Sequence, residues 1–178
     1  MTITNVLLTG GAGYLSSFII AAVKETYQQT LVDRVPIDSE LPSIQGDICD
    51  LDAVLKAAEH QDAIVHTVAL VRGRSANSAS DFADIMVKGT WHVLEACVQH
   101  KTKRLVNVSS IVANGYTAPS ARPLLPGDAV AYRPGDLNYC ISKKIGEVLA
   151  MAYAQAHSTS AIHLRPGVIA GDGANPGP

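Results

Sequence analysis

The stretch TGGAGYLS, at residues 9–16, decides the fold expected of this chain. The apolar run 3–9 before it is typical of a buried strand, and apolar residues recur at helical spacing over 17–26 after it. Glycines in such a turn permit positive φ and let the backbone approach a phosphate, and the following helix offers free N–H groups. This context predicts a dinucleotide-binding βαβ unit. The residues expected to contact the cofactor here are Gly10, Gly11, Ala12, Gly13, Tyr14 and Leu15.

An acidic residue follows at the end of the next predicted strand. Asp33 lies twenty residues beyond Gly13, where a carboxylate accepts hydrogen bonds from ribose hydroxyls and repels a 2′-phosphate. Asp33 therefore favours NAD. Arg34 comes directly afterwards and could favour a phosphate, so NADP remains the less favoured alternative and both residues belong to the expected binding set.

Strand-like and helix-like segments alternate along the rest of the chain. Further strands are predicted at 31–33, 43–45, 63–66, 104–108 and 161–164, and helices at 51–59, 81–100 and 136–157. Such alternation predicts an α/β fold, a Rossmann-type doubly wound parallel sheet with helices on both faces. We expect residues 1–178 to form one dinucleotide-binding domain.

Two loop-like stretches, 72–80 and 113–135, each follow a predicted strand. Ligands of doubly wound sheets sit outside the carboxyl ends of the strands, so both loops could line the ligand cleft. A plain surface connection is the alternative. For the second loop, function is favoured because long loops in compact domains tend to be functional.

The composition excludes several classes of function. A net charge of −2 implies no basic surface for nucleic acid, and no apolar run approaches the ~20 residues of a membrane span. The cysteines, Cys49, Cys97 and Cys140, are odd in number and far apart, so they indicate neither a disulfide framework nor a metal site. Without a visible signal peptide, a reducing cytoplasm is the expected location, and no metal is expected.

Further short motifs occur in a fixed order along nearly the whole chain. They are Gly46-Asp47-Ile48, DAIVHTVA at 62–69, Lys88-Gly89-Thr90, Val108-Ser109-Ser110, Tyr139-x-x-x-Lys143 and LRPGVIAG at 164–171. With the glycine-rich turn, this order resembles the extended short-chain dehydrogenase/reductase family, the NAD-dependent epimerase/dehydratases. Within it, the Ser-Ser and Tyr-Lys segments are most similar to uronate dehydrogenases and sugar epimerases.

The resemblance implies further cofactor contacts beyond the glycine-rich turn. They fall on Asp47, Ile48, Val68, Ala69, Val108, Ser109, Pro166, Gly167 and Val168. Three positions depart from the family pattern: Ser16 replaces the third glycine, Val68 a typical alanine, and Met86 a usual asparagine. These departures bear on cofactor affinity and leave the catalytic set untouched.

Tyr139 and Lys143 are four apart on a predicted helix and are therefore neighbours. A free tyrosine has a pKa near 10, and an adjacent ammonium can lower it toward the range of a general base. The resemblance implies that Tyr139 exchanges the substrate proton, Lys143 bonds the nicotinamide ribose and Ser110 holds the reacting oxygen. Tyr139 and Lys143 thus also count as cofactor contacts. A solvated pair on the helix surface is the alternative.

The resemblance implies an enzyme that transfers hydride between NAD and a secondary alcohol or ketone of a sugar-like substrate. Dehydrogenase (oxidoreductase), epimerase (isomerase) and dehydratase activities all fit. The alternative is a non-catalytic dinucleotide-binding module for redox sensing or protein interaction. Family members usually continue into a substrate-binding domain, which we expect to be largely absent here. A homodimer through the helices at 81–100 and 136–157 is implied, with intrachain core as the alternative for their apolar faces.

Overall fold

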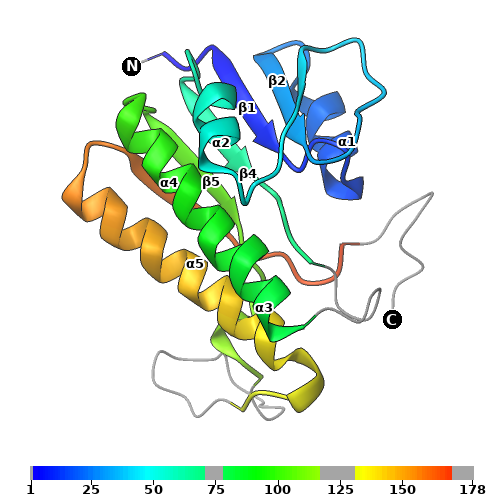
Figure 1. Ribbon diagram of the computed structural model, residues 1–178, viewed down its shortest axis with the longest axis vertical. Helices are drawn as coiled ribbons and strands as arrows, with labels where there is room; N and C mark the ends of the chain where they lie inside the picture. Colours follow the sequence, from blue (N-terminus) through cyan, green and yellow to red (C-terminus); the bar gives the residue numbers. More distant parts are fainter. Residues whose placement is uncertain (1, 71–77, 117–130, 170–178) are drawn as a thin grey trace.

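The computed structural model describes residues 2–70, 78–116 and 131–169. These form a six-stranded, all-parallel sheet in the order β3-β2-β1-β4-β5-β6 (Figure 1). The strands are β1 (Asn5–Thr9), β2 (Gln28–Asp33), β3 (Ser43–Gln45), β4 (Ala63–His66), β5 (Arg104–Val108) and β6 (Ser160–Leu164). The helices are α1 (Tyr14–Val23), α2 (Leu51–Ala57), α3 (Ala79–Phe82), η1 (Ala83–Lys88), α4 (Gly89–Gln99), η2 (Ile111–Asn114), η3 (Pro134–Asp136) and α5 (Leu137–Ala156).

The central strands are apolar because both faces of the sheet are covered there. Leu7, Leu31, Ile64 and Leu105 are each fully buried, one on each of the four central strands β1, β2, β4 and β5. Buried parallel strands read as continuous apolar runs, which is why short runs in the sequence located these strands. β2 begins at Gln28, three residues before the predicted 31–33, because its first residues are polar.

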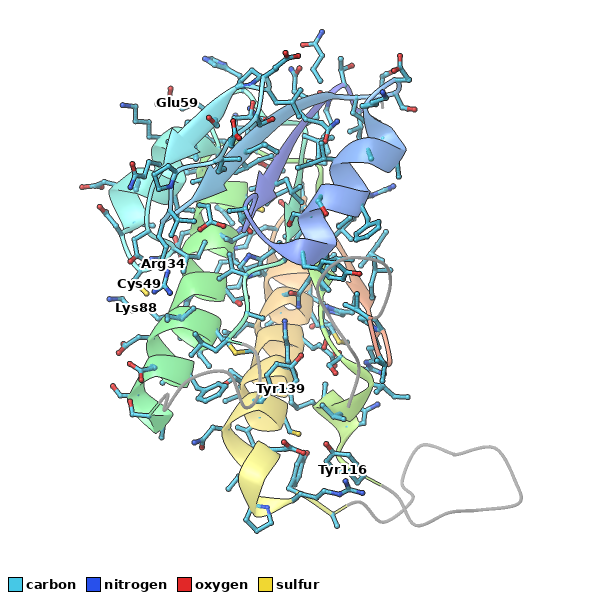
Figure 2. The ribbon with its side chains drawn as sticks, turned by 90° about the vertical axis from the view of Figure 1, so that its right-hand side faces the viewer. Arg34, Cys49, Glu59, Lys88, Tyr116 and Tyr139 are labelled. Atoms are coloured by element: carbon cyan, nitrogen blue, oxygen red, sulfur yellow. The ribbon has the colours of Figure 1, made fainter. Side chains whose placement is uncertain are left out.

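Helices lie on both faces of the sheet, which confirms the predicted doubly wound fold. In both views α1 lies on the opposite side of the strands from α4 and α5 (Figures 1 and 2). α4 packs between α2 and α5. Because the strand order reverses direction between β1 and β4, a crevice opens there at the carboxyl ends of the strands, where such folds bind ligands.

The helix predicted at 81–100 is present as a continuous helical segment over 79–99, but it is not α-helical throughout. It begins as α3, passes through the π-helical turn η1 and continues as α4. At the junction a side chain on Gly89 would stand 2.9 Å from Ile48, so the helix lies very close to the segment that joins β3 to α2. This tertiary contact has no counterpart in a hydrophobic pattern. No helix within the described ranges has the length and apolarity that a bilayer crossing requires.

Candidate active site

A cleft of about 730 Å³ lies at the carboxyl ends of the strands, within the usual size range of small-molecule and cofactor sites. Almost every residue that the sequence singled out lines it. These are Gly10, Gly13, Tyr14, Leu15, Asp33, Arg34, Asp47, Ile48, Val68, Ala69, Val108, Ser109, Ser110, Tyr139, Lys143, Pro166, Gly167 and Val168. Gly11 and Ala12 do not line the cleft. Their backbone N–H groups bond Val32 and Asp33 instead, so they shape the turn.

The glycine-rich turn needs a glycine at residue 10 for two reasons. Gly10 has φ +76°, in the left-handed region, and a Cβ there would stand 2.7 Å from Thr67 Oγ1. Its N–H donates to the Val32 carbonyl at 2.8 Å, which holds the turn over the end of β2. The backbone therefore passes close to the cleft with no side chain in the way.

The N-terminus of α1 opens into the cleft beside this turn. Gly13 is its N-cap in an extended conformation, and no side chain of the described residues caps the helix. Gly13, Tyr14 and Leu15 all line the cleft. Uncapped N–H groups at a helix N-terminus form a binding site for phosphate, which fits the predicted position of a pyrophosphate.

Ser16, one of the three departures from the family pattern, is an integral part of this turn. Its side chain is fully buried, and its hydroxyl donates to the Gly10 carbonyl at 2.7 Å. On the neighbouring strand end, the Thr67 hydroxyl donates to the Thr9 carbonyl at 2.7 Å. Ser16 thus fits the close packing that a third glycine would allow and adds a hydrogen bond.

Two carboxylates stand along the cleft next to the turn. Asp33 accepts from the N–H groups of Ala12 at 3.1 Å and Val35 at 3.2 Å, so its carboxylate is fixed at the end of β2. Asp47 accepts from the N–H of Cys49 at 2.8 Å. Figure 2 labels Arg34 and Cys49 at this end of the cleft, well away from Tyr139.

Tyr139 and Lys143, both on α5, line another part of the cleft. Figure 2 labels Tyr139 on this helix. The Lys143 Nζ lies 6.0 Å from the centre of the Tyr139 ring and donates to the Val108 carbonyl at 2.6 Å. Burial lowers the pKa of Lys143 to about 8, although the Glu147 carboxylate acts in the opposite direction. Lys143 is therefore a buried ammonium aimed at the site, unlike the solvated surface lysine of the alternative interpretation.

Ser109 and Ser110 follow β5 and are both buried cleft residues. The Ser110 hydroxyl accepts a weak 3.4 Å hydrogen bond from the Val112 N–H at the start of η2. Both hydroxyls therefore come from the strand end that faces Tyr139, and Ser110 remains the predicted partner of the reacting oxygen.

An ion pair between the buried Glu147 and the exposed Arg165, which the sequence analysis missed, supports this end of the site. Glu147 is 2% exposed and binds Arg165 through two hydrogen bonds, Nε to Oε1 at 2.7 Å and Nη2 to Oε2 at 2.8 Å. Burial raises the pKa of Glu147, but the Arg165 hydrogen bonds outweigh it and the net pKa is lowered. The pair ties α5 to the segment leading into Pro166. The sequence did contain a signal for Glu147, because it is four residues beyond Lys143 and therefore on the same face of the helix.

Tyr116 and Arg133 also line the cleft and were not singled out as residues. They lie at the two ends of the loop 113–135, of which residues 117–130 are outside the described residues. The Arg133 guanidinium stands 4.2 Å above the centre of the Tyr116 ring. The expectation that this loop borders the cleft is therefore confirmed for its described ends. In the first loop, 72–77 lies outside the described residues.

His66 is a neutral core residue beneath the site. It is 2% exposed, and burial, together with the nearby Lys143 charge, lowers its pKa to about 3. Because the Thr90 hydroxyl donates to the Met86 carbonyl, its oxygen is left to accept from His66 Nε2 at 3.2 Å. The Thr9 hydroxyl then donates to Nδ1 at 2.8 Å. Among the described residues, no cluster of three His, Cys, Asp or Glu side chains could hold a metal.

A parallel doubly wound sheet, an open glycine-rich turn and a Ser-Tyr-Lys set in one cleft define a nicotinamide-dependent type of site. The model of the NAD dependent epimerase/dehydratase family matches residues 6–178. The chain belongs to this family.

Individual relatives agree with this assignment. A dTDP-glucose 4,6-dehydratase from Streptomyces niveus is 29% identical over 90% of this chain and 52% of its own length. MoeE5, solved in complex with UDP-glucuronic acid and NAD, is 28% identical with a TM-score of 0.75 over 90% of this chain and 54% of that one. A uronate dehydrogenase mutant from Agrobacterium tumefaciens, solved with NAD, is 26% identical with a TM-score of 0.75, over 90% and 59%. The chain spans about half the length of the curated relatives it matches.

Proposed function

We propose that this chain binds NAD and catalyses hydride transfer between it and a secondary alcohol or ketone of a sugar-like substrate. This step is common to the dehydrogenases, epimerases and dehydratases among its relatives. The observation that carries the proposal is the buried Lys143 ammonium beside Tyr139 in a cleft that also contains the uncapped N-terminus of α1. We further propose that residues 1–178 act as a dinucleotide-binding domain.

The residues of the cleft fit NAD along its length. Asp33 offers a fixed carboxylate for the adenosine ribose, the turn at Gly10 leaves room for the pyrophosphate, and Lys143 lies where the nicotinamide ribose would be held. When bound, the nicotinamide supplies the acceptor or donor of the hydride. None of these expected contacts to NAD requires a metal ion.

The protein's own residues would then move the proton. Tyr139 accepts the hydroxyl proton of the alcohol as the C–H bond of the alcohol carbon gives up the hydride. In the reverse direction Tyr139 donates a proton to the carbonyl oxygen. Lys143, held by the Val108 carbonyl, stabilises the phenolate form of Tyr139 through its positive charge. The hydroxyl of Ser110 stabilises the negative charge that develops on the reacting oxygen.

NADH formation across a panel of sugars, uronic acids and nucleotide sugars tests the proposal. We expect Tyr139→Phe to lose about 10²- to 10⁴-fold in rate, because general acid–base catalysis contributes that much, while NAD affinity changes little. Tyr27→Phe is the matched control, since Tyr27 lies outside the cleft lining. Turnover unchanged in Tyr139→Phe would contradict the mechanism. Tight NAD binding without turnover of any substrate would favour a non-catalytic binding module.

We also propose a homodimer formed by the outer faces of α4 and α5. These helices lie side by side on the surface (Figure 1), and Trp91 on α4 is 47% exposed. A stripe of exposed apolar residues at helical spacing continues along α5: Leu137, Ile141, Ile145, Val148 and Met151. A patch of this kind indicates an interaction site, and a two-fold axis would place the same patch of a second copy against it.

Sedimentation velocity tests the dimer. We expect Val148→Glu to shift the protein toward monomer, because the introduced charge would be buried without a partner. Leu51→Glu, at another exposed apolar residue outside the stripe, should leave the sedimentation coefficient unchanged. A monomeric wild-type protein at micromolar concentration contradicts the proposal. We propose the cytoplasm as the location, because the odd number and wide spacing of the cysteines indicate no disulfide framework.

A further inference from the structure

The two ends of the loop 113–135 are joined at the mouth of the cleft. Tyr116 and Ala131 exchange backbone hydrogen bonds of 2.8 Å in an antiparallel bridge. This bridge brings Arg133 alongside Tyr116, where the guanidinium covers the ring at 4.2 Å from its centre. Arg133 is exposed, and both residues line the cleft together with Tyr139.

The Tyr116 ring is itself fixed to the helix that carries Tyr139. Its hydroxyl donates to Asp136 Oδ2 at 2.6 Å, and Asp136 is the N-cap of α5, three residues before Tyr139. Figure 2 places Tyr116 below Tyr139, beside the N-terminal end of this helix. The ring on which Arg133 lies is therefore tied to the start of the helix that carries Tyr139.

The chemistry left to Arg133 is that of an anion receptor. A guanidinium over the face of an aromatic ring keeps its N–H donors available to bind a carboxylate or phosphate through two hydrogen bonds. Arg133 forms no salt bridge with any of the described residues, Asp136 included. The other charged residues of the described lining are Asp33, Arg34, Asp47 and Lys143, which the proposed NAD position already uses.

We propose that Arg133, stacked on Tyr116, is the group that selects substrates bearing an anion near the reacting carbon. This inference rests on the proposed function and adds the substrate class to it. Two kinds of substrate carry an anionic group that a guanidinium can bind: a free sugar acid, through its carboxylate, and a sugar nucleotide, through its diphosphate. Binding to Arg133 would orient either one against Tyr139.

Ligand binding to the NADH complex of Tyr139→Phe protein tests this without relying on turnover. Titration calorimetry would compare glucuronate with glucose, and UDP-glucose with glucose. We expect Arg133→Gln to weaken binding of an anionic ligand about 10- to 100-fold, the usual worth of a charge-assisted hydrogen-bonded pair, and to change glucose binding less than about twofold. Arg133→Lys should recover only part of the loss, because the planar fork is missing.

The arms of the experiment separate the two anion sources. A loss confined to glucuronate identifies a carboxylate, and a loss confined to UDP-glucose identifies a diphosphate. Arg104→Gln is the matched control, because Arg104 lies at the opposite end of the sheet, where it donates to Ser160.

Three outcomes overturn the inference. In the first, Arg133→Gln weakens anionic and neutral ligands equally, which indicates a structural role. In the second, Arg133→Gln weakens binding of neither kind of ligand. In the third, no anionic ligand binds the Tyr139→Phe protein that keeps Arg133. Each can occur while the Tyr139-dependent turnover of the proposed function holds. Conversely, anion selectivity by Arg133 without any turnover would contradict only the proposed catalysis.

Discussion

The hydroxyl of Ser16 donates a 2.7 Å hydrogen bond to the carbonyl of Gly10, so the first turn of α1 is bound to the turn that precedes it. Ser16→Ala removes this bond in a fully buried place, and we expect a loss of about 1 kcal/mol in unfolding free energy. NAD affinity should fall by a few-fold, since the turn loses rigidity. Ser17→Ala is the control, because the exposed Ser17 hydroxyl only bonds Tyr14 within the helix. Equal effects of the two substitutions would remove the special role of Ser16.

Cofactor selectivity should depend on the carboxylate at the end of β2. Asp33 accepts from the Ala12 and Val35 N–H groups, and Asn can keep one of these contacts without the negative charge. We therefore expect Asp33→Asn to reduce the preference for NAD over NADP by about tenfold, which corresponds to ~1.4 kcal/mol. Fluorescence titration with NADH and NADPH measures it. A wild-type protein that binds both equally would make this interpretation of Asp33 wrong.

The buried Lys143 should leave a mark on alkaline stability. Its folded-state pKa is about 8, against 10.5 for a free lysine, so between these values the unfolded chain holds more protons. Stability contributed by this group therefore rises from pH 8 to pH 10.5, by about 3 kcal/mol in total. We expect Lys143→Met to lack this rise in urea unfolding, and Lys144→Met, whose lysine bonds the exposed Asn114, to keep it. Parallel pH curves for wild type and Lys143→Met would contradict the prediction.

The neutral His66 should make the protein sensitive to acid. Its folded pKa is about 3, below the ordinary 6.5, so its contribution is complete above pH 6.5 and is lost as the pH falls toward 3. Between pH 8 and pH 5 this amounts to about 2 kcal/mol. His66→Asn removes the titrating group, and its unfolding free energy should vary less over this range. A wild-type curve no steeper than that of the variant would show that His66 is not responsible.

Local patterns predicted the fold well because its signals are local. The bounds of β3 and β4 agree with the strands predicted at 43–45 and 63–66. For β4 the signal is an apolar run, and for the exposed β3 it is the Gly46-Asp47 pair that ends the strand. The π-helical turn η1 was not predicted, because a hydrophobic pattern indicates a helix without distinguishing its α-helical from its π-helical turns.

The candidate site likewise contains some residues that the sequence predicted and others that it did not. Gly10 was found from its place in a turn between a strand and a helix, and Tyr139 and Lys143 were found from the family resemblance. The structure brings all three to one cleft. Arg133 was missed because its meaning comes from Tyr116, seventeen positions earlier in the chain, which only the folded loop ends bring beneath it.

The exposed indole on α4 has a practical consequence. Trp91 is the single tryptophan of the chain, is about half exposed and donates its ring N–H to the Tyr153 hydroxyl at 2.7 Å. Its ultraviolet emission thus comes from one known position on the surface where a second copy is proposed to bind. Trp91 is therefore an intrinsic fluorescent probe, and a blue shift of its emission as the protein is concentrated would report association without any added dye.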